Sequence, residues 1–299
     1  MRSNSNVTKV TAVPGYIVFC IFLALTAAMD SESILTKSPP PADAKLAYGT
    51  DPYQFGEMRL PGGKGRHPVL TFIHGGFWRA KYDLKHAGHL CAALAKSGIA
   101  TWNLEYRRVG NFGGGWPGTF EDILQGYRFL SQLAARYSLD MNRSLIAGHS
   151  AGGQLALCLA AHQRLAVAVI SLAGVVDLQQ AWDLHLSHDA VAEFLGGSPQ
   201  RVPKRYEEAS PIQLPLGQTP QWLIHGADDD TVPPVMSRHY VEVKRKRGEQ
   251  ANLLQIEHAG HFDLIDPESN AWKQVQETTL QLIQRSGRRH PLSGMPAKP

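Results

Sequence analysis

From about residue 55 the chain repeats one order of apolar and polar positions: a short apolar run, a loop, then a longer amphipathic stretch. Apolar runs of about four to eight residues between turn residues are typical of buried strands, whereas apolar positions three and four apart are typical of helices. The pattern predicts an α/β fold with a mostly parallel central sheet and helices on both faces. The expected strands are 69–73, 99–104, 144–147, 167–172, 222–225 and 253–257, and the expected helices are 84–97, 120–137, 235–247 and 269–284.

Three further segments stand out by composition from the folded domain that we expect over residues 53–286. Residues 29–52 are polar and rich in proline, which predicts a linker or an extended arm. Residues 177–220 interrupt the alternation between two strands and are too short for a separate domain, so we expect a small cap or crossover there. The tail, residues 287–299, is expected to be disordered.

The first 28 residues have the composition of an export signal. Two basic residues and an apolar run over residues 16–29 precede the first acidic residue, and small residues allow cleavage after Ala28. We therefore expect export to the periplasm or secretion. The alternatives are an uncleaved anchor, or a start at Met29 that would leave the protein in the cytoplasm.

The net charge bears on which partners we expect, and the cysteines bear on whether we expect disulfides. The formal net charge is +4, but no basic stripe is interleaved with aromatic residues, so nucleic acid is not an expected partner. The densest basic cluster, residues 244–247, falls at the end of an expected helix and is interpreted as a solvated terminus. Cys91 and Cys158 lie on apolar helical patterns and are expected in the core, not in a disulfide. No firm membrane partner is expected, and the oligomeric state stays open.

The chemistry centres on the motif Gly148-His149-Ser150-Ala151-Gly152. An apolar run precedes it and an apolar, alanine-rich stretch follows, so the motif joins a strand to a helix. In that context G-x-S-x-G places the serine on a strained turn, with glycines where a side chain would collide. We expect Ser150 to be a nucleophile beside a helix N-terminus, which favours negative charge.

Three other loops follow predicted strands and would meet this motif at the edge where parallel strands end. They carry HGGFW at 74–78, HGADDD at 225–230 and HAGHFD at 258–263. A serine nucleophile needs an adjacent base, and the base needs a third group to fix its tautomer. His261 is the preferred base because a flexible Ala-Gly turn precedes it, whereas the rival, His258, directly ends a strand.

The acid that orients this base is left open among Asp228, Asp229 and Asp230. Three adjacent carboxylates cannot all be buried and charged at low cost, so at least one faces water or caps the following helix. Spacing alone does not choose among them.

Acyl transfer also needs hydrogen-bond donors for the oxyanion. The backbone N–H groups of Gly76 and Phe77, in the glycine-rich loop, are candidates, together with that of Ala151 after the nucleophile. Two aromatic residues, Trp78 and Trp116, could line a substrate pocket or could serve only in packing.

Together these motifs resemble the α/β-hydrolase superfamily, in its esterase and lipase branch with an HGG oxyanion loop. The resemblance covers about residues 55–285, with serine, acid and histidine in the family's order. The family's acid loop, H-G-x-x-D-x-x-V-P, implies Asp229 as the acid, with Asp228 second. It also implies that His74 orients the oxyanion loop. HGGFW is similar to the HGG-x-W loop of kynurenine formamidases, and the chain is similar to small secreted esterases that remove acetyl or feruloyl groups from plant polysaccharides.

These observations predict a serine hydrolase that cleaves small carboxylic esters through an acyl-enzyme intermediate, with neither a metal nor an organic cofactor. The absence of a long lid insertion favours short acyl chains. An arylformamidase would use the same catalytic residues and is the main alternative. A peptidase is disfavoured because the chain has no room for a large N-terminal propeller. A non-catalytic binding protein would be expected to lack one of the three catalytic residues.

Overall fold

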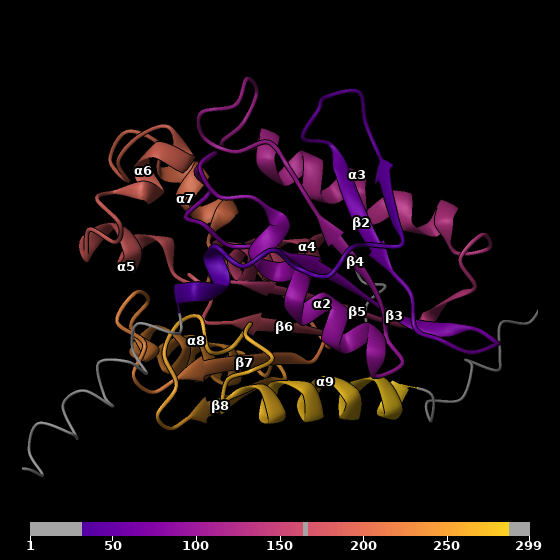
Figure 1. The fold of residues 1–299 in the computed structure, drawn as a ribbon. Coiled ribbons are helices and arrows are strands. Elements are labelled where there is room, and N and C mark those ends of the chain that lie inside the picture. Colours follow the sequence, from indigo (N-terminus) through magenta and orange to yellow (C-terminus); the bar gives the residue numbers. More distant parts are fainter. Residues whose placement is uncertain (1–31, 164–166, 287–299) are drawn as a thin grey trace, which may run out of the picture.

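A single sheet runs through the part of the chain that the structure, a computed structural model, describes, residues 32–163 and 167–286 (Figure 1). Within these ranges the strands are β1 (Ala44–Ala47), β2 (Phe55–Arg59), β3 (His67–Ile73), β4 (Ala100–Leu104), β5 (Leu139–His149), β6 (Ala168–Leu172), β7 (Gln221–Gly226) and β8 (Ala251–Ile256). Their order in the sheet is β1-β2-β4-β3-β5-β6-β7-β8. Neighbouring strands from β4 to β8 are parallel, and β1 and β2 form an antiparallel edge.

Helices cover both faces of this sheet. They are the 3₁₀ turns η1 (Glu32–Leu35) and η2 (Leu84–Ala87) and the α-helices α2 (Gly88–Lys96), α3 (Gly118–Leu133), α4 (Ala151–His162), α5 (Leu178–Asp183), α6 (Ala190–Leu195), α7 (Pro203–Ala209), α8 (Pro234–Lys246) and α9 (Trp272–Ser286). Helices α2 and α9 pack on one face, and α3, α4 and α8 pack on the other (Figure 1).

Strand β3 shows how the sequence builds these two layers. Successive side chains of a strand point to opposite faces of the sheet. Val69 and Ile73 lie in the core beneath α3 and α4, whereas Leu70 and Phe72 lie in the core beneath α2 and α9. A strand that is buried on both faces has a continuous apolar sequence, which is why the pattern identified it. The predicted α/β fold with a mostly parallel sheet is confirmed.

Some local predictions differ from the structure. Strand β1 lies inside 29–52, the segment expected to be a linker or an arm, and pairs with β2 at the sheet edge. Its four residues alternate between half-buried and exposed positions, so no apolar run marks it.

The interpretation of 244–247 as wholly solvated is wrong at Lys244. That side chain is buried, donates to the carbonyl of Leu214 and lies 3.6 Å from Glu249.

The predicted excursion at 177–220 contains α5, α6 and α7, which group at one end of the sheet in Figure 1. The predicted signal at 1–28 and the tail at 287–299 lie outside the described residues. Cys91 and Cys158 are buried and unpaired, as expected. In the ranges that are described, no helix is long and apolar enough to cross a membrane.

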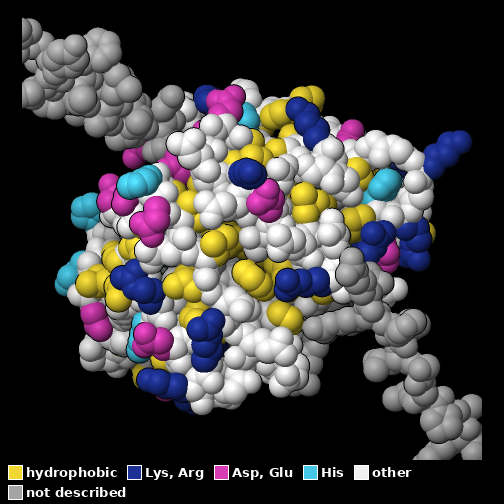
Figure 2. Space-filling view, turned by 90° about the horizontal axis from the view of Figure 1, so that it is seen from below, with side chains coloured by type: hydrophobic (Ala, Val, Ile, Leu, Met, Phe, Trp, Pro, Cys, Tyr) yellow, Lys and Arg dark blue, Asp and Glu magenta, His cyan; other side chains and the backbone are white. Residues whose placement is uncertain are grey.

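Positive and negative side chains are mixed on the face shown in Figure 2. Lys and Arg side chains lie among Asp and Glu side chains there, and hydrophobic side chains are scattered between them. This distribution agrees with the small net charge of the chain, +4.

Candidate active site

Ser150 lies on a sharp turn between β5 and α4. Its backbone has φ 56° and ψ −122°, a conformation that costs a non-glycine residue energy and that clusters at functional sites. The flanking glycines are required by close packing. A Cβ on Gly148 would lie 2.1 Å from the carbonyl oxygen of Gly152, and one on Gly152 would lie 2.1 Å from that of Ile73. The motif therefore forms the strand-turn-helix unit that the sequence predicts.

His261 and Asp229 form a buried hydrogen-bonded pair. Nδ1 of His261 lies 2.7 Å from Oδ2 of Asp229, and both residues are buried. Because an ionised carboxylate only accepts hydrogen bonds, Nδ1 is the donor, and a neutral ring then keeps its lone pair on Nε2. This is the tautomer that a general base for a serine requires.

The alternatives for base and acid are placed differently. The side chain of His258 is 94% exposed and lies 3.9 Å from Asp228, which is also exposed. Asp230 is exposed as well. Of the three adjacent carboxylates, Asp229 alone is buried against His261. The structure thus brings together the pair that the sequence favoured.

Four donors converge on the carboxylate of Asp229. Oδ1 accepts from the backbone N–H groups of Thr231 and Val232, and Oδ2 accepts from His261 and, at 3.2 Å, from Nε2 of His225. Burial by itself raises the pKa of Asp229, but the hydrogen bonds from His225 and His261 outweigh it, so the pKa lies well below its usual value. Asp229 is therefore held ionised.

His225 is a residue whose role the sequence did not reveal. It ends the buried strand β7, and its side chain is fully buried. Nδ1 lies 2.7 Å from the hydroxyl of Ser237 on α8, and Nε2 lies 2.9 Å from the carbonyl of Val232. The carbonyl can only accept, so Nε2 carries the proton and also faces Asp229. The available signal was a histidine at the end of an apolar strand, four residues before the acid.

His149 connects the turn at Ser150 to the loop that carries His261. Its Nε2 donates to the carbonyl of His261 over 3.0 Å, and the two rings lie 4.5 Å apart. Burial and the neighbouring His261 lower the pKa of His149 well below its usual value, so the ring stays neutral. The residue directly before Ser150 therefore holds the loop that carries His261.

The glycine-rich loop lies against Ser150. A Cβ on Gly75 would be 3.0 Å from the Cβ of Ser150. The next three residues all have positive φ: 112° at Gly76, 47° at Phe77 and 56° at Trp78. Among the described residues, no acceptor binds the N–H groups of Gly76, Phe77 or Ala151. These groups have the availability that an oxyanion hole requires.

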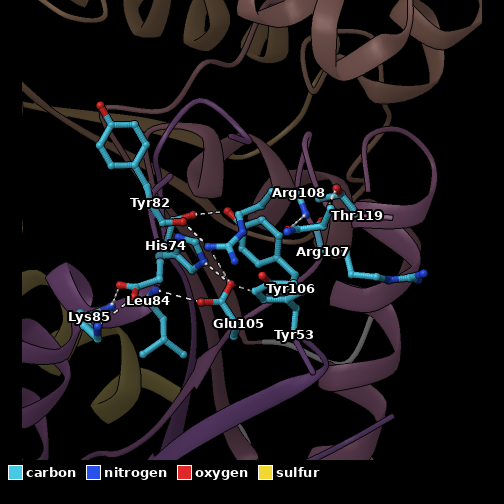
Figure 3. Close-up of polar contacts among 12 residues, drawn as sticks. Tyr53, His74, Tyr82, Leu84, Lys85, Glu105, Tyr106, Arg107, Arg108 and Thr119 are labelled. Carbon is cyan, nitrogen blue, oxygen red and sulfur yellow. Dashed lines mark hydrogen bonds and ion pairs between the residues drawn. The ribbon is translucent and has the colours of Figure 1, made fainter. Parts of the chain in front are cut away.

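His74 anchors this loop, and Figure 3 shows the side chain beside Glu105 and Tyr106. The ring is fully buried and stacks on Tyr106 at 4.4 Å, and the Tyr106 hydroxyl donates to the carbonyl of His74 over 2.7 Å. Nδ1 of His74 lies 2.8 Å from the carbonyl of Gly75, and Nε2 lies 3.1 Å from the carboxylate of Glu105. The ring thus fixes the first peptide of the loop.

Glu105 is a second residue that the sequence analysis missed. It directly follows β4 and is buried, and Arg108 approaches its carboxylate to 3.1 Å. The carboxylate also accepts from the backbone N–H groups of Tyr106 and Leu84 (Figure 3). A charged residue at the carboxyl end of a buried strand was the available signal. Glu105 holds His74, which holds the glycine-rich loop.

The two candidate pocket tryptophans differ in exposure. Trp78 is fully buried, stacks on Phe194 at 4.5 Å and donates from Nε1 to the side chain of Gln154 over 3.0 Å. Its side chain therefore serves in packing. Trp116 is half-buried and stacks on Phe120 at 5.3 Å.

A cavity of about 520 Å³ lies beside His261. Its acidic lining residues are Glu32, Asp228, Asp230, Asp263, Asp266 and Glu268. This negative lining disfavours anionic groups on that side of the base. Within the described ranges, no group of three or more His, Cys, Asp or Glu side chains is placed to hold a metal ion.

Comparison with known sequences gives relatives that are named as hydrolases. The BD-FAE family model matches residues 58–243. A probable isoprenylcysteine alpha-carbonyl methylesterase of Oryza sativa subsp. japonica is 26% identical over 74% of this chain and 57% of its own. Kynurenine formamidase of Drosophila melanogaster is 25% identical over 67% of each chain, and esterase LipC of Mycobacterium tuberculosis is 27% identical over 74% of this chain and 60% of its own. The chain thus spans about three fifths of the length of the first and third of these relatives.

Solved structures share the fold. A truncated carbohydrate esterase from gut microbiota superposes with a TM-score of 0.70 at 21% identity, over 83% of this chain and all of that one. Esterase B from Lactobacillus rhamnosis superposes with a TM-score of 0.70 at 20% identity, over 91% of this chain and 94% of that one. The predicted α/β-hydrolase fold is confirmed.

Proposed function

Because the chain belongs to the BD-FAE family of α/β-hydrolases, we propose that it is a serine hydrolase that cleaves carboxylic esters. The observation that carries the proposal is the buried Asp229–His261 hydrogen bond, 2.7 Å long, beside the strained turn that holds Ser150. The relatives named above as an esterase and a methylesterase support ester hydrolysis.

The proposed mechanism assigns a role to each of these three residues. Nε2 of His261 takes the proton of the Ser150 hydroxyl as its oxygen attacks the acyl carbon, and the resulting imidazolium then protonates the leaving alcohol. Asp229 holds the ring in the required tautomer and stabilises its positive charge. Water, activated by the same histidine, cleaves the acyl-enzyme and restores the serine. Besides the ester and water, the proposed steps use only groups of this chain.

The oxyanion is stabilised by the loop and by the helix start. The N–H groups of Gly76 and Phe77 are proposed donors from the loop, and that of Ala151 is the proposed donor from the N-terminus of α4. Each donor is worth about 3–4 kcal/mol of transition-state stabilisation in acyl transfer. The positive end of the α4 dipole adds to this field.

We propose a preference for short acyl chains. The excursion between β6 and β7 contains three short helices of six, six and seven residues, and Trp78, a candidate pocket residue, is occupied by packing. The half-buried Trp116 is the remaining candidate to contact the substrate. A long acyl chain needs an extended apolar groove, so a clear preference for long-chain triglycerides would contradict this proposal.

An arylformamidase is the second candidate. A relative named as a kynurenine formamidase supports it, as does the HGGFW loop. Formamide cleavage would use the same three residues, so the structure does not separate the two activities, but a substrate comparison does.

The test compares short p-nitrophenyl esters with N-formylkynurenine, using wild type and Ser150→Ala in parallel. We expect efficient ester cleavage that the Ser150→Ala variant loses, with weak formamide cleavage. A preference for the formamide of a hundredfold or more would establish an arylformamidase instead. Ester cleavage retained in the variant would contradict the mechanism.

A further inference from the structure

The oxyanion loop is held in a conformation that it would not adopt alone. Gly76, Phe77 and Trp78 have consecutive positive φ values. For the two non-glycine residues this backbone region is sparsely populated, and it persists only where surrounding contacts determine it. His74 fixes the peptide before this turn, which leaves open what fixes the turn itself.

Arg79, the next residue, reaches across to the excursion between β6 and β7. Its guanidinium binds both carboxylate oxygens of Glu193 on α6, at 2.8 and 3.1 Å. It also donates to the hydroxyl and the carbonyl of Ser187, at 2.9 and 2.8 Å. Such bidentate geometry fixes orientation as well as distance. The loop and α6 are therefore joined at the end of the strained turn.

A second contact joins the same two elements through the core. The ring of Trp78 lies on that of Phe194, at 4.5 Å with an interplanar angle of 8°. The other end of Trp78 is held by Gln154 of α4, whose amide also donates to the carbonyl of Ala209 on α7 over 2.7 Å. Trp78 is thus fixed between α6 and the helix that begins beside the nucleophile.

The segment before α6 is strained as well. Ser187, His188 and Asp189 have φ values of 49°, 56° and 59°. The contacts of Arg79 therefore join two runs of residues with positive φ, 76–78 and 187–189. Each run needs surrounding contacts to keep its conformation, and the other run supplies some of them.

We propose that α6 is a brace for the oxyanion loop, with Arg79, Glu193 and Phe194 as positioning residues that hold the N–H groups of Gly76 and Phe77 in place. The inference rests on the proposed function, because it assigns α6 a part in the same reaction. The excursion then contributes to catalysis through the loop and does not need to contact substrate.

Donors that act on the oxyanion stabilise the transition state more than the bound ester. Loosening the brace therefore lowers kcat and leaves KM nearly unchanged. Removing a whole oxyanion donor costs about 100-fold or more, so a misplaced donor should cost about tenfold.

The experiment measures kcat and KM for p-nitrophenyl butyrate. Glu193→Ala should lower kcat about tenfold with KM within about twofold of wild type. Glu193→Gln keeps an acceptor oxygen for Arg79 and should recover most of the loss. Arg79→Ala should lose at least as much as Glu193→Ala, because it also removes the two hydrogen bonds to Ser187. The double variant should be no worse than Arg79→Ala, since the Arg79–Glu193 contact is already broken there.

A matched control is available at the start of β5. Arg143 pairs with Asp140 over 2.7 Å, with partial exposure similar to that of the Arg79–Glu193 pair. Asp140→Ala should leave kcat unchanged. Wild-type kcat in Glu193→Ala, an equal loss in Asp140→Ala, or a loss confined to KM would overturn the proposal.

Amide hydrogen exchange gives a reading that does not depend on activity. Val109 donates to the carbonyl of Trp78, and Ala80 donates to that of Val109, at 2.8 and 2.9 Å. Both amides should exchange faster in Glu193→Ala and at the wild-type rate in Asp140→Ala; unchanged exchange in Glu193→Ala would overturn the brace. Absence of Ser150-dependent ester cleavage in wild type would instead refute the proposed function, and exchange would still decide the brace.

Discussion

Oδ2 of Asp229 accepts hydrogen bonds from two histidines, at 2.7 Å from Nδ1 of His261 and at 3.2 Å from Nε2 of His225. The first bond orients His261, the proposed base, and the second orients Asp229, the proposed acid. Variants at Asp229 and at His225 separate these effects.

Asp229→Asn should reduce kcat for short esters by about 10⁴-fold, because an amide can stabilise the wrong tautomer of His261 and cannot stabilise its positive charge. Asp228→Asn is the matched control. That carboxylate is exposed and faces His258, so its neutralisation should leave kcat unchanged. Steady-state kinetics of both variants checks this assignment, and a large loss in Asp228→Asn would transfer the role to Asp228.

His225→Phe, which fills the site but has no donor, should lower kcat by about tenfold without changing KM, because Asp229 loses one of its four donors and its orientation loosens. The same change should raise the pKa of Asp229, because a hydrogen bond to the ionised form is removed. Titration of the Asp229 carboxyl, followed by NMR in the wild type and the variant, should show this rise. A variant with the wild-type kcat and an unchanged Asp229 titration would show that His225 serves only in packing.

Glu105→Ala should lower the free energy of unfolding by roughly 3–5 kcal/mol, because it leaves His74 and Arg108 buried without their shared carboxylate. Urea unfolding measures the loss, and surviving folded protein should also show reduced kcat because His74 no longer holds Gly75 firmly. Glu121→Ala on α3 offers an exposed control. An unfolding free energy in Glu105→Ala equal to that of wild type would contradict the role assigned to this carboxylate.

His86 should make the protein less stable in acid. Burial, with a contribution from His74, lowers the pKa of His86 to about 3. Between that value and the ordinary value near 6.5 the unfolded chain binds a proton that the folded chain does not, so stability falls as pH falls through this window. Between pH 7 and pH 4 the free energy of unfolding of His86→Gln should fall by roughly 3 kcal/mol less than that of wild type, because glutamine does not titrate. Equal pH slopes for the two proteins would contradict this account.

The fold and the strand-turn-helix unit at Ser150 could be predicted because their signals are local. The apolar run at β3 and the G-x-S-x-G turn at Ser150 are visible within a few residues of sequence. The acid was ambiguous, because Asp228, Asp229 and Asp230 differ in burial, not in type. Only the fold shows that one of them lies under His261.

The supporting residues could not be predicted, for a different reason. Glu105, His225 and Phe194 act on partners that are distant in sequence, and each carries a side chain that is common in unrelated roles. Strand β1 was missed because an edge strand of four residues needs no apolar run. Predictions from sequence therefore reached the groups that we propose to react and not the residues that hold them.

Covalent labelling tests the central assignment, Ser150 as nucleophile, most directly. Wild-type protein treated with an ethyl p-nitrophenyl phosphonate should release one equivalent of p-nitrophenol, lose ester hydrolysis and carry a single phosphonyl group that peptide mass spectrometry places on Ser150. Asp229→Asn should react far more slowly, and Ser150→Ala should not react at that position. An adduct on another residue, or full ester hydrolysis by protein labelled at Ser150, would contradict the account.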